Sequence, residues 1–172
     1  QLFIRQSVNT FHDNNGVIHS IGMEYTGPLH FMKFWLEEIA SCPNHQLVAL
    51  TATKDVQDAV LQDSLYNKMV DIIDIRQWHY RNDGSLYEYR SRYPEKAVTY
   101  NAAMPRNVEG NAANWAVFMA GGSLAKVPPI EAMDVYTLAS EFQPVASLTE
   151  SDRQWVMGKA QKGYLVYCLE TD

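Results

Sequence analysis

At 172 residues and a net charge of −6, the chain has the size of one ordinary domain, or of one domain with a small appendage. It is 47% apolar and 20% charged, as expected for a globular protein with a substantial core. No basic stripe is present that could neutralise phosphates, so nucleic acid is not expected as a partner. No apolar run reaches the roughly 18 residues that a membrane span needs.

The two cysteines, Cys42 and Cys168, are too few for a metal-ligand set or a disulfide framework. His19 and His30 have no partner at metal-ligand spacing, and we expect neither a metal nor a cofactor. The aromatic fraction is 12%, with four Trp and ten Tyr. Such a surplus suits a carbohydrate site, where sugar rings stack on indole and phenol, but the same residues could equally fill the core. No signal peptide is recognisable, but the sequence starts inside a helical pattern, so its first residues do not predict a location.

Strand and helix patterns alternate along most of the chain. Four hydrophobic segments predict β-strands: Val17–Thr26, Leu47–Asp55, Ile72–Tyr80 and Ala97–Asn101. Helical patterns occupy residues 1–14, 27–40, 55–69, 112–120 and 131–142, with a turn at 81–84 and a loop or short helix at 87–95. This rhythm is typical of βαβ units and predicts an α/β fold with parallel strands.

A complete eight-stranded TIM barrel typically needs about 250 residues, which exceeds this chain. The chain is therefore a half-barrel, a piece of a larger enzyme, or a sequence from which residues are absent, and we favour the last two. After Pro144–Ser147 the pattern changes to an antiparallel hairpin, with strands at 154–158 and 164–169. We expect a barrel-type domain at 1–145 and a β segment at 146–172.

Glu24 is the strongest candidate for chemistry. It lies near the carboxyl end of the first predicted strand, just before the helix start at Gly27-Pro28, with Tyr25 beside it to orient a substrate. Parallel α/β proteins build their sites at this end of the strands, and burial would raise the pKa of a general acid. The structural alternative is a carboxylate that interacts only with helix amides and the helix dipole.

Asp55 and Asp74 are the candidates for a second carboxylate. Asp55 follows the second strand, where an ordinary N-cap is the alternative. Asp74 shares a strand face with Arg76, which would favour its charged form, and a buried structural ion pair is the alternative.

Aromatic residues follow Asp74 on the same strand. Trp78, His79 and Tyr80 end this strand and could form the wall of a sugar site, although His79 alone reads more simply as a hydrogen-bonding loop residue. No P-loop, dinucleotide fingerprint or nucleophile elbow is present, and Gly121-Gly122 predicts the end of a helix.

Longer runs of residues resemble the second half of a TIM-barrel glycoside hydrolase. They are Gly22–Phe31, Ala52–Ala59, Asp74–Tyr80 and Trp115–Ser123. The most similar group is that of bacterial polysaccharide-degrading, apiosidase-like glycosidases, which often carry a C-terminal β-sandwich of the collagen-binding type. The resemblance covers residues 1–142, and the hairpin matches the start of that β-sandwich.

The resemblance implies an acid/base glutamate at the end of barrel strand four, which corresponds to Glu24. It also implies a plant or algal polysaccharide substrate, a periplasmic or extracellular location, and the missing barrel half or another protomer as a partner. The pattern departs from the family at Thr99–Asn101, where no strand-seven nucleophilic glutamate is visible.

The distance between strands separates the two candidates for the second carboxylate. Neighbouring strands lie about 4.8 Å apart, so Asp55 would approach the roughly 5–5.5 Å of a retaining pair. Asp74, one strand further on, would approach the roughly 6.5–9.5 Å of an inverting pair. We favour Asp74, because Asp55 already has a structural task. The alternative function is a non-catalytic carbohydrate-binding module that keeps the aromatic side chains and needs no paired carboxylates.

Overall fold

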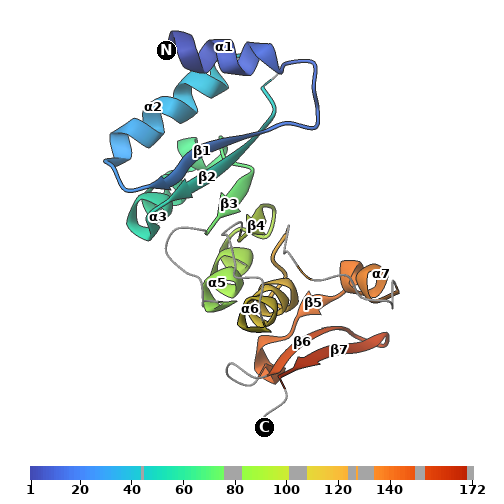
Figure 1. Ribbon diagram of the computed structural model, residues 1–172. Helices are drawn as coiled ribbons and strands as arrows, with labels where there is room; N and C mark the ends of the chain where they lie inside the picture. Colours follow the sequence, from blue (N-terminus) through green and yellow to red (C-terminus); the bar gives the residue numbers. More distant parts are fainter. Residues whose placement is uncertain are drawn as a thin grey trace. The chain divides into compact units, whose positions relative to one another are not determined.

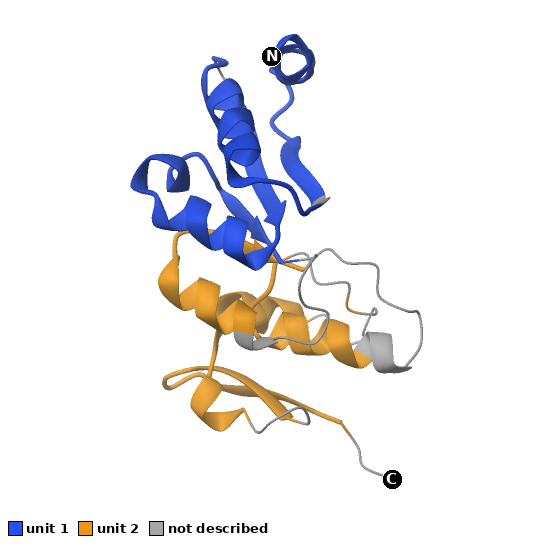
Figure 2. Ribbon diagram, turned by 90° about the vertical axis from the view of Figure 1, so that its left-hand side faces the viewer, with its two compact units in different colours: residues 1–78 blue, residues 79–172 orange. Residues whose placement is uncertain are grey.

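The computed structural model describes residues 1–43, 45–75, 83–100, 108–123, 127, 134–149 and 154–169. The chain divides into two compact units, residues 1–78 and residues 79–172, which are shown in different colours in Figure 2. Each unit is described by itself. These compact units do not test the predicted division into domains at 1–145 and 146–172, which stays a prediction.

The first unit alternates helices and strands (Figure 1). Its elements are α1 (Leu2–Thr10), β1 (Ile18–Tyr25), α2 (Leu29–Ala40), β2 (Leu47–Ala52), α3 (Lys54–Gln62), α4 (Ser64–Asn67) and β3 (Ile72–Asp74). β1 pairs with β2, and β2 pairs with β3, both in parallel. The predicted α/β class with a parallel sheet is therefore confirmed.

Burial on both faces of the central strand explains its composition. Every residue of β2 from Val48 to Ala52 is buried, as expected for a parallel strand covered on both sides. Its side chains belong to an apolar core shared with β1, β3, α2 and α3. Fully or almost fully buried members of this core are Ile21, Met32, Leu36, Val48, Leu50, Val60 and Ile73.

The predicted boundaries on either side of α3 were wrong. β2 ends at Ala52 instead of Asp55, because α3 already begins at Lys54. The single helix predicted for 55–69 is split into α3 and α4 at Asp63, whose backbone is extended and whose carboxylate accepts a 3.1 Å hydrogen bond from the Leu65 N–H. Asp63 thus acts as the N-cap of a new helix.

The second unit combines helices with an antiparallel sheet. Its elements are α5 (Asp83–Arg92), β4 (Ala97–Thr99), α6 (Val108–Met119), α7 (Asp134–Glu141), β5 (Gln143–Pro144), a 3₁₀ turn (Ala146–Leu148), β6 (Gln154–Lys159) and β7 (Gly163–Cys168). The three strands β5, β6 and β7 form the sheet in that order. The predicted antiparallel hairpin is confirmed, whereas the turn expected at 81–84 runs into α5, which begins at Asp83.

Aromatic side chains hold the hairpin against α6. Trp155 on β6 is 4% exposed and clusters with Met119 and Phe142. Tyr167 lies opposite Trp155 in the β-ladder and stacks on Trp115 of α6, with ring centroids 5.4 Å apart. Desolvation in this cluster raises the pKa of the Tyr167 hydroxyl above its ordinary value. Ring packing of this kind joins the sheet to the helix in one core.

Candidate functional site

A bulge in β1 contains the predicted acid, Glu24. Ile21 pairs with Leu50 and Tyr25 pairs with Ala52, so residues 22–24 of β1 span the place of Thr51 alone on β2. Gly22 has a φ of +72°, and a Cβ there would lie 2.6 Å from the Thr51 carbonyl oxygen. Only glycine fits this backbone. Bulges re-aim the residues that follow them and are common next to active sites.

Asp74 is a buried carboxylate at the carboxyl end of β3. It is the last residue of that strand and is 5% exposed. Its Oδ2 accepts a 3.0 Å hydrogen bond from the hydroxyl of Thr51, which is 1% exposed and lies on the neighbouring strand. The sequence placed Asp74 in the middle of a longer strand, whereas β3 ends there. A rigid sheet thus fixes this carboxylate in one orientation.

Gln57 braces the same strand ends from α3. Its side chain is completely buried. Its Oε1 accepts a 3.3 Å hydrogen bond from the Ala52 N–H, and its Nε2 donates to the Asp74 carbonyl oxygen at 3.5 Å. One amide side chain therefore connects the ends of β2 and β3, which holds the backbone around Asp74.

Asp55 lies at the start of α3 and not on the sheet. The N-cap position belongs to Thr53, so the predicted N-cap role of Asp55 was wrong by two residues. The Asp55 carboxylate is exposed and accepts hydrogen bonds from the Thr53 hydroxyl and from the Val56 N–H, and these lower its pKa. An acid held in its charged form at a helix start favours a structural role.

Tyr25 closes the end of β1 against the start of α2. Its hydroxyl donates a 3.0 Å hydrogen bond to the Pro28 carbonyl oxygen, and its ring stacks on Phe31 with centroids 5.5 Å apart. Phe31 is 43% exposed and its ring lies 6.1 Å from that of Trp35. An aromatic surface therefore begins at the strand end that carries Glu24.

Several predicted site residues fall outside what the structure describes. They are the side chain of Glu24 and the whole of Arg76, Trp78, His79 and Tyr80. The structure brings Asp74 together with Thr51 and Gln57, which the sequence did not single out as site residues. A signal for Thr51 was present, because it is a polar residue inside an apolar strand. Gln57 gave none, since a glutamine on an amphipathic helix usually faces solvent.

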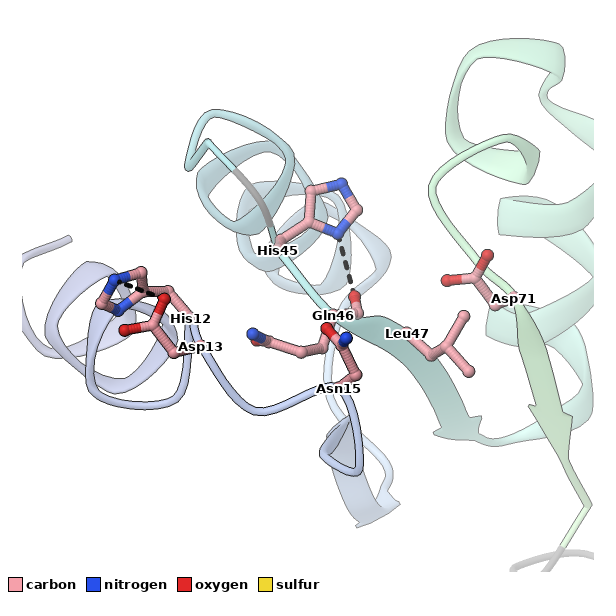
Figure 3. A pocket seen from close by; sticks show the side chains of 7 residues that line it. All are labelled: His12, Asp13, Asn15, His45, Gln46, Leu47 and Asp71. Carbon is pink, nitrogen blue, oxygen red and sulfur yellow. Dashed lines mark hydrogen bonds and ion pairs between the residues drawn. The ribbon is translucent and has the colours of Figure 1, made fainter.

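A hollow lies at the opposite, amino ends of the strands (Figure 3). Its volume is about 660 Å³, and it is open and polar. The residues that line it are His12, Asp13, Asn15, His45, Gln46, Leu47 and Asp71. Asp71 Oδ2 accepts a 2.8 Å hydrogen bond from the Val48 N–H, and His45 Nδ1 lies 2.9 Å from the Gln46 carbonyl oxygen. These hydrogen bonds hold the loops that precede β2 and β3, which is a structural role.

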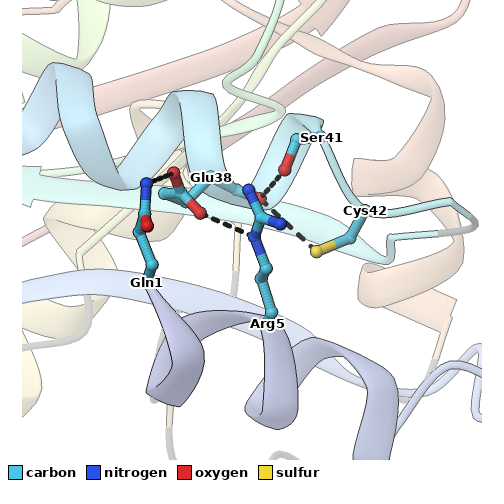
Figure 4. A network of polar contacts seen from close by, with 5 residues as sticks. All are labelled: Gln1, Arg5, Glu38, Ser41 and Cys42. Carbon is cyan, nitrogen blue, oxygen red and sulfur yellow. Dashed lines mark hydrogen bonds and ion pairs between the residues drawn. The ribbon is translucent and has the colours of Figure 1, made fainter.

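Glu38 is a further buried acid of the first unit, and its hydrogen-bond partners explain why it is buried (Figure 4). Its carboxylate accepts hydrogen bonds from Arg5 Nε at 2.8 Å and from Gln1 Nε2 at 3.0 Å, which join α1 to α2. The hydrogen bond from Arg5 lowers the pKa of Glu38, and the same contact raises the pKa of Arg5. Glu38 is therefore a structural carboxylate.

Among the residues described, no group of three or more His, Cys, Asp and Glu side chains is placed to hold a metal ion, and no helix is long and apolar enough to cross a membrane. The chemistry that the carboxyl end of the sheet can support is proton transfer or nucleophilic attack by carboxylates. Asp74 lies at this end of the sheet, and Glu24 lies on a strand of the same sheet.

Comparison with known proteins assigns the chain to a family. No curated protein and no solved structure matches it. One family profile, described as a domain of unknown function (DUF6298), matches residues 1–88 and 85–142. Because these segments together cover well over half of the 172 residues, the chain belongs to the family described as domain of unknown function DUF6298.

Proposed function

We propose that this chain is part of a TIM-barrel glycoside hydrolase that cleaves a plant or algal polysaccharide by carboxylate acid/base catalysis. In this proposal Glu24 is the acid/base residue and Asp74 is the second carboxylate. The C-terminal hairpin would be the start of a β-sandwich. The resemblance of the sequence to apiosidase-like enzymes supplies the substrate class and a periplasmic or extracellular location.

The observation that carries the proposal is the buried Asp74 carboxylate at the carboxyl end of a parallel strand, oriented by Thr51. Burying a carboxylate is costly, so a protein that keeps one at this end of the sheet has a reason to do so. The alternation of helices and parallel strands from α1 to β3 is the one that a barrel segment would have, which supports the proposal.

Glycoside hydrolysis needs two carboxyl groups with different tasks. One protonates the leaving oxygen, and the other either activates a water or attacks the sugar directly. Asp74 suits the second task better than Asp55, because Asp55 is exposed and engaged by Thr53 and Val56 at a helix start. β1 and β3 flank β2, so Glu24 and Asp74 would approach the larger separation of an inverting pair.

The remaining predicted residues would bind the sugar. Trp78 and Tyr80 would stack on its apolar faces, while Arg76 and His79 would donate hydrogen bonds to its hydroxyls. Tyr25 would contribute its ring edge, since its hydroxyl already donates to Pro28.

The test compares Glu24→Gln and Asp74→Asn with the parent on a panel of plant and algal polysaccharides and activated aryl glycosides. Asp55→Asn is the matched control, because it removes an exposed carboxylate close to the same strand ends. We expect losses of roughly 100-fold or more in the first two variants and little change in the control. Circular dichroism confirms that each variant is folded. Equal activity in all four proteins would remove both residues from the mechanism.

A non-catalytic carbohydrate-binding module is the second candidate. The stacked pair of Tyr25 and the exposed Phe31 favours it, because such rings bind sugars without any carboxylate. Trp35 touches Phe31 and is a fluorescent reporter of this surface. Fluorescence quenching by an oligosaccharide in the absence of hydrolysis would support this function, provided that Phe31→Ala abolishes the quenching.

A further inference from the structure

We infer that a cavity in the second unit is a binding site for a small carboxylate attached to a ring, and that Arg90 receives the carboxylate. The cavity has a volume of about 420 Å³. Arg90, Phe118, Gly121, Ser123, Tyr136 and Ser140 are among the residues that line it. This inference does not rest on the proposed glycosidase activity, since all of these residues belong to the second unit.

Arg90 carries a charge that no described carboxylate neutralises. Its Nη1 donates to the Gly121 carbonyl oxygen at 2.8 Å, and its Nη2 donates to Gln143 Oε1 at 3.0 Å. Both acceptors are neutral. Arg92, two residues further along α5, is instead paired with Glu88 at 2.9 Å. Charged side chains that are removed from water are usually paired. The partly buried guanidinium of Arg90 is therefore suited to bind an anion.

The end of α6 holds the guanidinium in place. Gly121 has a φ of +82°, its N–H donates to Phe118 O, and the Gly122 N–H donates to Val117 O, which together form a Schellman motif. A Cβ at Gly121 would lie 2.8 Å from Arg90 Nε. Glycine at this position therefore both ends the helix and admits the guanidinium, so the orientation of Arg90 is fixed before any ligand arrives.

The donors left on Arg90 match a carboxylate. A guanidinium has five N–H groups, and the two protein acceptors use two of them. The other three suffice for a bidentate bond to a carboxylate. A single positive charge matches one monoanion. Lys159 and Lys162 of the hairpin share the single carboxylate of Glu141 on α7, which leaves this group with one positive charge, but none of the three residues lines the cavity.

The remaining wall of the cavity suits a ring. Phe118 and Tyr136 meet edge to face, with centroids 5.9 Å apart and an interplanar angle of 82°. Ala139, Phe142 and Met157 add further apolar surface. Pockets for small molecules combine such apolar walls with a few polar anchors, and about 420 Å³ lies within their usual range. A sugar acid and an aromatic acid share this chemistry.

Two pairs of probes test the inference with calorimetry or ligand-observed NMR. Benzoate is compared with benzamide, and glucuronate with glucose, so that each pair differs mainly in the charged group. We expect the full chain to bind at least one acid and to prefer it to its neutral partner by about tenfold or more. Binding of benzoate alone identifies aromatic acids as the ligand class, and binding of glucuronate alone identifies uronic acids.

Three variants locate the binding. Arg90→Gln should weaken it about tenfold or more, while Arg92→Gln, on the same helix, should leave it unchanged. Ser140→Trp lies on the exposed side of α7 and should obstruct the cavity without touching the bonds of Arg90, which covers the case in which Arg90→Gln misfolds. Glu24→Gln and Asp74→Asn should still bind, which separates this site from the proposed active site.

Three results would overturn the inference. They are no binding of either acid up to about 20 mM, equal binding of the acids and their neutral partners, and equal losses in Arg90→Gln and Arg92→Gln.

Discussion

The hydroxyl of Thr51 donates a 3.0 Å hydrogen bond to the carboxylate of Asp74, and both side chains are almost completely buried. The two residues lie side by side because Leu50 and Ile73, which precede them, are paired in the parallel ladder. The bond therefore joins β2 and β3 at the end of the sheet where α/β proteins place their sites. Buried polar groups of this kind are sensitive to the loss of one partner.

Thr51→Val should lower the free energy of unfolding by about 1.5–3 kcal/mol. Valine has nearly the same shape, so the apolar packing is kept while the carboxylate loses a donor. Urea denaturation followed by circular dichroism measures the change. Thr51→Ser, which keeps the hydroxyl, should lose clearly less. A valine variant as stable as the parent would mean that the hydrogen bond contributes nothing to the free energy of unfolding.

Gly22→Ala should destabilise the first unit by about 2 kcal/mol or more. Alanine in the left-handed region costs about 1–2 kcal/mol, and the new Cβ would in addition press on the Thr51 carbonyl oxygen. Gly16→Ala is the matched control, because Gly16 does not have a positive φ and a Cβ there meets only a side-chain oxygen at 3.2 Å. Equal denaturation midpoints for the two variants would mean that the bulge tolerates a side chain.

The overall order of elements could be predicted from the sequence, because hydrophobic periodicity reports which faces are buried. β1 and β2 alternate or run apolar over five or more residues, so their positions were found. The bulge at Gly22 was not, since a glycine in an alternating pattern is also compatible with a regular strand. The break at Asp63 was missed because the apolar spacing continues across it, and only the capping bond to Leu65 reveals it.

The candidate site could be predicted only in its location. A carboxylate after an apolar strand indicates the carboxyl end of the sheet, which is where Asp74 lies. Its partners depend on the register between β2 and β3 and on which face of α3 is buried. Periodicity within one segment contains neither piece of information, so Thr51 and Gln57 required the structure.

The ion pair between Glu38 and Arg5 should make stability depend on pH in the acid range. The hydrogen bond from Arg5 lowers the pKa of Glu38 below its ordinary value of 4.5 in the folded state. The unfolded chain therefore binds the proton more readily, so the stabilisation is complete above about pH 4.5 and is lost as the pH falls through the lower, folded-state pKa.

Urea midpoints measured between neutral and acid pH for the parent and for Glu38→Gln test this dependence. The variant should be less stable at neutral pH, and the difference between the two proteins should shrink in acid. Arg5→Gln should behave in the same way, because it removes the other partner of the pair. A difference that stays constant over the whole range would show that the loss comes from packing alone.

Trp155→Ala should be the most destabilising of these changes, by about 3–5 kcal/mol. The ring is 4% exposed, lies 5.6 Å from that of Tyr167, and packs with Met119 and Phe142, so truncation leaves a cavity among neighbours from α6, from the residue after α7 and from both strands of the hairpin. Tyr164→Ala is the control, because Tyr164 lies on the same hairpin and is 66% exposed, and it should cost less than about 1 kcal/mol.

Hydrogen exchange shows which elements lose stability in Trp155→Ala. If the hairpin and α6 share one core, amides of α6 and β6 should lose protection together in Trp155→Ala, whereas loss confined to β6 and β7 would mean that the sheet opens independently of the helix.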